Sequence, residues 1–235
     1  MRLAIALLTL VLVPVSAPAQ TVVDPSGHWE GTIQAPQMET AIEIDLARDG
    51  AGALIGTFGQ PGERLTGLPL SDFALDGTAI RFQIKGKAGE RAFDGKLSAD
   101  GKSITGSFTM QGFPMPFTLT RTGDAKIATV AGGPQLGNDL VGSWDGTLDV
   151  RGTLVRLTLT MANRPDGTSA ASIVNVDQGL EIPVSAITQA GSSVTLEVKS
   201  ISGSYTGAVN TAGTELVGTF IQGAGSAPLT FRRIQ

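Results

Sequence analysis

One short motif occurs twice in this chain and contains both of its tryptophans. GHWEGTI begins at Gly27, and GSWDGTL begins at Gly142. Further matches follow in the same order, among them PFTLTR ending at Arg121 against PLTFRR ending at Arg233. Each copy is far longer than the units that stack into solenoids, so each is predicted to be a domain of its own.

The repeat divides the mature chain into two predicted domains, residues 20–123 and residues 141–235. Residues 124–140 between them show no sustained apolar period and include a Gly-Gly-Pro break at 132–134. That composition is typical of a linker.

Within each copy, apolar residues alternate with polar ones, which predicts half-buried β-strands. The clearest runs are residues 42–46 and 80–84 in the first copy and 157–161 and 194–198 in the second. Asp-Gly turns separate such runs, and we count eight candidate strands per copy with no amphipathic helix after the leader. Eight short antiparallel strands can close on themselves and remove exposed edges. We therefore predict an all-β fold of two tandem small eight-stranded up-and-down barrels, with a pair of β-sandwiches as the alternative.

The first nineteen residues have the features of a signal peptide. Arg2 precedes an apolar run, Leu3 to Val13, that is too short to span a bilayer, and Ala17-Pro18-Ala19 supplies small residues for cleavage after Ala19. An uncleaved anchor is the alternative, which Pro14 and the short run disfavour. The chain has no cysteine, which excludes disulfides, lipid attachment through a thiol and thiol chemistry. A periplasmic or secreted bacterial protein without a membrane span in its mature form is predicted.

The charges exclude some classes of partner. The formal net charge is −4, and acidic and basic residues are scattered without a basic stripe. Nucleic acid and anionic membrane surfaces are therefore not expected as partners.

A tryptophan begins each copy and an arginine ends it, pairing Trp29 with Arg121 and Trp144 with Arg233. The first and last strands of a closed barrel are neighbours, so each guanidinium can lie over an indole that plugs the barrel end. This pattern resembles the calycin signature shared by lipocalin-like and avidin-like barrels. The resemblance implies a structural role for the four residues, and ligand stacking by the indoles is the alternative.

The second copy carries a further resemblance. Its motifs WDGTL, NVDQG, IPVS, GSYTG and LVGTFIQG resemble the β-rich domain that precedes the catalytic domain in some secreted bacterial α/β-hydrolases of esterase or peptidase type. The first copy is a weaker version without the Asp-Gln-Gly. No G-x-S-x-G nucleophile elbow is present, so the resemblance implies a module and not hydrolase activity.

Polar residues beside turns are the candidates for ligand or partner contacts. We single out Asn175, Asp177 and Gln178, together with Gln111 and Gln222, each of which precedes a glycine near the last strand. Such side chains can line a barrel mouth. The alternative for each is a loop that only satisfies its own hydrogen bonds.

No catalytic, metal or cofactor site is predicted. His28 is the only histidine, which rules out a cluster of several histidines around a metal and leaves little for a triad. Asp49, Asp100 and Asp166 precede glycines, where a turn is the expected role and calcium binding the alternative.

Two functions remain open at this point, with an enzyme as a third and disfavoured reading. One is a non-catalytic interaction or accessory module that acts with a separate secreted α/β-hydrolase. The other is a carrier that binds a small apolar ligand in or at the mouth of a barrel. Large residues at the expected inward positions favour a filled interior and hence the module: Ile42, Ile44, Phe82, Leu157, Met161 and Phe231.

Overall fold

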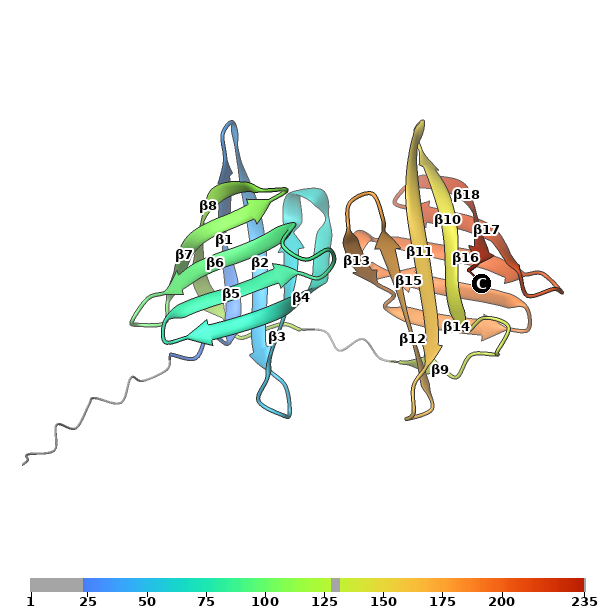
Figure 1. The fold of residues 1–235 in the computed structure, drawn as a ribbon, viewed down its shortest axis with the longest axis horizontal. Helices are drawn as coiled ribbons and strands as arrows, with labels where there is room; N and C mark the ends of the chain where they lie inside the picture. The colour runs from blue at the N-terminus through green and yellow to red at the C-terminus, as the bar shows by residue number, and fades with distance from the viewer. Residues whose placement is uncertain (1–22, 128–131, 235) are drawn as a thin grey trace, which may run out of the picture.

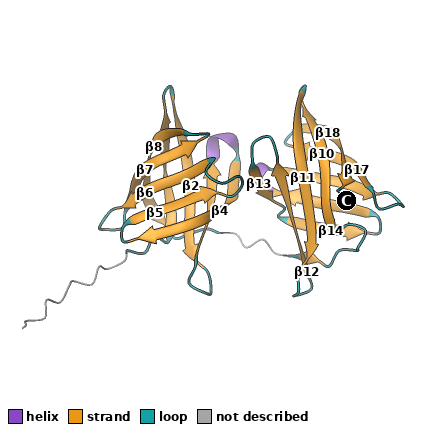
Figure 2. Ribbon diagram, viewed as in Figure 1, coloured by secondary structure: helices purple, strands orange, loops and turns teal. Residues whose placement is uncertain are grey.

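The structure is a computed structural model that describes residues 23–127 and 132–234. The predicted signal peptide and its cleavage site lie outside the described residues. In the described ranges the chain is mostly β-strand, with two short 3-10 turns, η1 (Pro61–Glu63) and η2 (Lys199–Ile201) (Figure 2). None of the helical segments in these ranges is long and apolar enough to span a bilayer.

The first copy forms a closed antiparallel barrel in which each strand pairs with the next and β8 returns to pair with β1 (Figure 1). Its strands are β1 (Gly27–Ala35), β2 (Met38–Arg48), β3 (Leu54–Gln60), β4 (Leu65–Asp76), β5 (Ala79–Ile84), β6 (Arg91–Leu97), β7 (Ser103–Met110) and β8 (Phe113–Gly123).

The second copy forms a second antiparallel barrel, in which β10 pairs with β11 on one side and with β18 on the other (Figure 1). Its strands are β10 (Gly142–Val150), β11 (Thr153–Asn163), β12 (Thr168–Asn175), β13 (Leu180–Pro183), β14 (Ala186–Ala190), β15 (Ser193–Val198), β16 (Gly203–Val209), β17 (Glu215–Gln222) and β18 (Gly225–Arg233). The prediction of two tandem antiparallel barrels is confirmed.

The strand count differs from the prediction in the second barrel, because the fourth strand is divided into β13 and β14. β13 pairs only with β12 and β14 only with β15. The two residues between them continue the connection: the Val184 amide donates to Ala171 O at 3.1 Å, and the Ser185 amide donates to Glu197 O at 2.6 Å. In the first barrel β4 stays continuous, and its pairing with β5 shifts register after Ser71. The same bend is thus a bulge in one barrel and a break in the other.

The interior is built from the inward-facing apolar positions. All six residues expected to point inward are buried, and both tryptophans are fully buried. In the first barrel, four phenylalanine rings pack around Phe93, whose centroid lies 4.5 Å from that of Phe108 and 4.9 Å from that of Phe82. Burial of these rings contributes to the hydrophobic driving force for folding of the first barrel.

The glycine within each tryptophan motif, two residues after the tryptophan, has a packing role. A Cβ at Gly31 would lie 1.9 Å from Thr118 O on β8, a distance that no side chain tolerates. At Gly146 the nearest atom to such a Cβ is a ring carbon of Phe231 at 2.8 Å. The W-[ED]-G-T motif therefore lets the first and last strands approach closely where the barrel closes.

Part of the predicted linker belongs to the second barrel. A two-residue strand, β9 (Gly133–Pro134), pairs with Thr168 and Ser169 at the start of β12. Leu136 and Leu140 are buried in the second barrel's core. Two isolated apolar residues show no period, which is why this packing was not visible in the sequence pattern.

Candidate functional site

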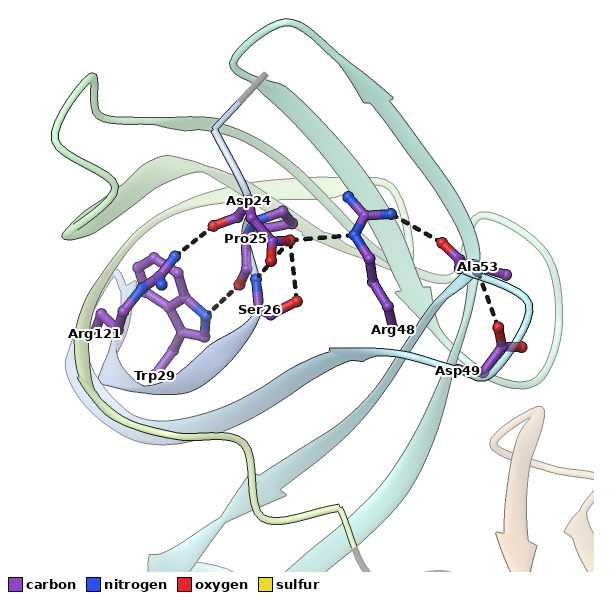
Figure 3. A network of polar contacts seen from close by, with 9 residues as sticks. Asp24, Pro25, Ser26, Trp29, Arg48, Asp49, Ala53 and Arg121 are labelled. Atoms are coloured by element: carbon purple, nitrogen blue, oxygen red, sulfur yellow. Dashed lines mark hydrogen bonds and ion pairs between the residues drawn. The ribbon is translucent and has the colours of Figure 1, made fainter. Parts of the chain in front are cut away.

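The tryptophan end of the first barrel is closed by a compact set of contacts (Figure 3). Trp29 Nε1 donates to Pro25 O at 3.0 Å, and the guanidinium carbon of Arg121 lies 4.7 Å from the indole centroid. Arg121 Nη2 also donates to Asp24 O at 2.6 Å. The segment before β1 is thereby tied across the end of the barrel.

The second barrel repeats this arrangement with more hydrogen bonds. Trp144 Nε1 donates to Leu140 O at 3.0 Å, and the guanidinium carbon of Arg233 lies 4.1 Å from the indole centroid. Arg233 donates to three backbone carbonyls, those of Gly213, Val141 and Asp139. In contrast, Arg121 Nε is buried without a partner among the described residues. The structure thus places each predicted Trp–Arg pair together, at the closed end of its barrel.

The opposite end of the first barrel contains an apolar chamber of about 290 Å³. Its wall is formed where the β1–β2, β3–β4 and β7–β8 connections meet, and it includes three of the chain's five methionines. The lining residues are Ile33, Ala35, Met38, Thr40, Phe58, Gln60, Leu65, Leu68, Ile84, Arg91, Phe108, Met110, Met115 and Leu180.

The chamber corrects the expectation of a wholly filled first barrel. Large inward residues fill the barrel near Trp29, but at the other end the inward positions include the small residues Ala35 and Thr40. Ala35 and Thr40 lie on the adjacent strands β1 and β2, and their small side chains leave volume at this end of the barrel. Gln60, Thr40 and Arg91 supply the few polar groups in the wall.

Leu180 is the one lining residue that comes from the second barrel. It follows the hairpin between β12 and β13, which lies beside the first barrel (Figure 1). Gly86 forms an isolated antiparallel bridge with Leu180, the Lys87 amide donates to Gly179 O at 2.9 Å, and the Glu181 amide donates to Lys85 O at 3.1 Å. The second barrel therefore adds a short strand edge to the rim of the first.

Side chains reinforce this junction. Lys85 Nζ lies 3.0 Å from Glu181 Oε1, and Arg91 Nη1 donates to Gln178 O at 2.6 Å. A charge-assisted bond of this kind orders the long arginine side chain. Arg91 is thus held at the rim of the chamber, with its guanidinium beside the apolar wall.

The predicted site residues Asn175, Asp177 and Gln178 form the turn of this hairpin. Asn175 Oδ1 accepts from the Gln178 amide at 3.0 Å. Asp177 accepts from the Arg156 amide and from Arg156 Nε, both at 2.7 Å. The hydrogen bond from the Arg156 backbone amide is the largest cause that holds the pKa of the Asp177 carboxyl below its usual range. The hydrogen bond from the Arg156 guanidinium is the second cause. The three residues shape the segment that contacts the first barrel, and their side chains lie outside the chamber lining.

The two predicted glutamines occupy the matching hairpin turns. Gln111 adopts a left-handed backbone with φ of 51°, and its amide donates to Glu90 O at 3.0 Å. Gln222 Nε2 donates to Ile201 O at 2.9 Å, which ties the last hairpin to η2. Both side chains are exposed, and neither lines the chamber.

The aspartates before glycines have turn roles. Asp49 Oδ1 accepts from the amides of Ala51 and Ala53, each at 2.9 Å. Hydrogen bonds from Ser98 to Asp100 and from Thr168 to Asp166 lower the pKa of these two carboxyls. In residues 23–127 and 132–234, no group of three or more His, Cys, Asp or Glu side chains is arranged to hold a metal ion.

His28 is buried, with 4% of its surface exposed. Its Nδ1 lies 2.8 Å from Asp45 Oδ1, and its Nε2 lies 3.3 Å from Glu30 Oε1. Asp45 Oδ1 also accepts from the Lys126 amide at 2.7 Å, which fastens the chain as it leaves the first barrel. The imidazole therefore joins β1, β2 and the departing chain.

Sequence reasoning missed Arg91 and Leu180. Leu180 contacts a different repeat, so no local pattern indicates its partner. Arg91 stands two residues before the inward-facing Phe93, which places it on the inward face at the barrel rim. That period-two relation was the available signal.

Neither a protein-family model nor a curated protein matches this chain. Among solved structures, a protein of unknown function of the DUF3598 family from Nostoc punctiforme PCC 73102 shares 14% identity with a TM-score of 0.26. That match covers 94% of this chain and 100% of the other. A protein from Bacteroides fragilis NCTC 9343 named "putative outer membrane protein" shares 10% identity with a TM-score of 0.26, covering 90% of this chain and 98% of that one.

Proposed function

We propose that the protein is an exported, non-catalytic carrier that binds one small apolar ligand in the mouth of its first barrel. The observation that supports this proposal is the chamber of about 290 Å³ beneath Leu180. Ligand pockets start at about 300 Å³ and are mainly apolar with a few placed polar groups. Eight-stranded barrels also have room for a single small ligand.

The polar groups define the expected ligand more closely. Among the described residues, Arg91 is the only charged one in the chamber wall, and its guanidinium is oriented by Gln178 O. A ligand with an apolar body and one acceptor group can bury the first against Phe58 and Phe108 and present the second to Arg91. Export to the periplasm is part of the proposal and rests on the leader sequence at residues 1–19.

The test is a titration with the neutral fluorescent probe N-phenyl-1-naphthylamine. Saturable binding to the mature protein is expected, and Ala35→Trp should fill the chamber and weaken it at least about tenfold. Val150→Trp is the matched control, because Val150 holds the equivalent strand position in the second barrel and lies outside the chamber. Equal binding by both variants, or no binding by the wild type, would refute the carrier.

A second function, an accessory module for a separate secreted α/β-hydrolase, is favoured by the exposed hairpin tips of the first barrel. Met38 is 65% exposed and Phe113 is 74% exposed, beside the chamber mouth. Exposed apolar groups that cluster at one end are typical of a protein contact surface. A photo-crosslinker at position 113 in the native host tests this role. Capture of a hydrolase supports it, and crosslinks only within the chain count against it.

A further inference from the structure

A second cavity, separate in character from the apolar chamber, lies between the two barrels. Its volume is about 430 Å³, and both copies contribute to its wall. Glu30, Glu43 and Asp45 come from β1 and β2, while Ser185, Lys199 and Ser200 come from the bend after β13 and from η2. The cavity exists because η2 packs against β4 of the first barrel.

Carboxylates of the first barrel and Lys199 of the second barrel face this cavity, and Lys126, in the segment that leaves the first barrel, lines it as well. On the first-barrel side, Asp45 is already engaged by His28 and by the Lys126 amide. Glu30 contacts His28 at 3.3 Å, and Glu43 has no ion pair within the described part of the chain. On the second-barrel side, Lys199 has only a contact of 4.0 Å with Glu197. Carboxylate and ammonium thus line one cavity without neutralising each other.

Ser200 is the independent sign that something binds here. The residue is 4% exposed, and its Oγ has no hydrogen-bond partner among the described residues. A buried hydroxyl left unpaired is unfavourable, and native structures satisfy nearly all such groups. Ser200 also lines the cavity, so rotation of its side chain toward the cavity would let its hydroxyl donate to a ligand there.

We propose that the cavity between the barrels binds a small zwitterion of the amino-acid or short-peptide class. The ligand's ammonium group meets Glu43 and Glu30 of the first barrel. Its carboxylate meets Lys199 and accepts a hydrogen bond from Ser200 Oγ. A molecule with separated opposite charges can meet both the carboxylates and the lysines of the cavity, whereas a simple anion or cation can meet only one of the two.

The proposal is independent of the apolar carrier, because the two cavities have different linings. Only Phe58 lines both. Ala35→Trp, which fills the apolar chamber, should leave zwitterion binding unchanged. Loss of binding of one ligand without loss of binding of the other then distinguishes the two proposals.

Isothermal titration of the mature two-barrel protein tests the site with dialanine, N-acetyl-dialanine and dialanine amide. Dialanine should bind, and each capped form should bind at least about tenfold more weakly, because one charge-assisted contact is lost. Glu43→Gln should weaken dialanine but not the acetylated form. Lys199→Gln should weaken dialanine but not the amide.

Ser200→Ala should weaken dialanine by about threefold to tenfold without lowering thermal stability, since the hydroxyl has no partner inside the protein. Ser169→Ala is the matched control: its hydroxyl is likewise buried and unpaired among the described residues but does not line this cavity. Absence of dialanine binding, equal binding of all three probes, or an equal effect of the two serine variants would overturn the proposal.

Discussion

The two barrels share a closed end and differ at the other. At the closed end, Trp29 with Arg121 and Trp144 with Arg233 repeat the same cation–π contact and the same bond from the indole to a carbonyl four residues earlier. At the open end, the first barrel keeps a chamber, and the second sends Leu180 over it. Closure is therefore set by a few shared positions, while the interior is free to diverge.

The interiors of the two barrels differ at their centres. Where the first barrel has Phe93 at the centre of an aromatic cluster, the second has Tyr205, whose hydroxyl lies 3.0 Å from Leu216 O and 3.2 Å from Leu229 O. Gly207 and Gly218 leave room for this hydroxyl, since a Cβ on either would lie within 2.7 Å of it. Burial raises the pKa of the Tyr205 phenol, which favours the neutral hydroxyl that donates these bonds.

The largest expected effect is the loss of a tryptophan. Trp29→Ala and Trp144→Ala should each lower the free energy of unfolding of their barrel by about 3–5 kcal/mol, because a fully buried indole is removed. Denaturant unfolding measures both. A near-neutral result for either one would show that its indole does not close the barrel.

Replacing the two arginines should destabilise the two closed ends to different extents. Arg233→Ala should destabilise more than Arg121→Ala, because Arg233 donates to three carbonyls and Arg121 to one. The double variant Trp144→Ala with Arg233→Ala should be non-additive by about 0.5–3 kcal/mol, since both changes break one contact. Strict additivity would contradict a shared plug.

Tyr205→Phe tests the divergence of the interiors. Removing the hydroxyl leaves two buried carbonyls without this partner and should lower stability by about 1–2 kcal/mol. Phe82→Leu, which gives the first barrel the residue found at the matching position of the second, is the complementary variant. An unchanged unfolding midpoint for Tyr205→Phe would mean that the hydroxyl does not stabilise the second barrel.

The junction between the barrels should respond more weakly. Lys85→Gln should lower the stability of the contact by roughly 0.5–1 kcal/mol, because the pair with Glu181 is partly exposed. Hydrogen exchange should rise at residues 176–182 and at 85–90 and stay unchanged elsewhere. Arg81→Gln, which removes an exposed pair within the first barrel, is the control.

The smallest expected effect concerns pH. The lowered pKa of Asp177 means that its bonds to Arg156 stabilise the fold above the usual aspartate value of 3.8 and are lost as the pH falls through the lower folded value. Carboxyl-carbon NMR titration should give a pKa below 3.8 for Asp177. Arg156→Gln should raise it toward that value.

Much of the barrel fold was predictable from the sequence, because it depends on patterns that repeat locally along the chain. The Trp–Arg pairing followed from the position of each residue on a first or last strand, and the inward set from Ile42 to Phe231 followed from a period of two. What could not be predicted depends on contacts distant in sequence. The break at Val184 reflects which neighbour each half-strand joins, and the cover supplied by Leu180 reflects how one barrel sits on the other.

Methionine methyl NMR tests the central claim most directly, because the chain carries its own methionine reporters. Met38, Met110 and Met115 line the chamber, and Met161 lies buried in the second barrel. On titration with N-phenyl-1-naphthylamine, ring currents should shift the three chamber methyls along one saturation curve and leave Met161 unchanged. If the chamber methyls do not move, or Met161 moves with them, the first barrel does not hold the ligand site.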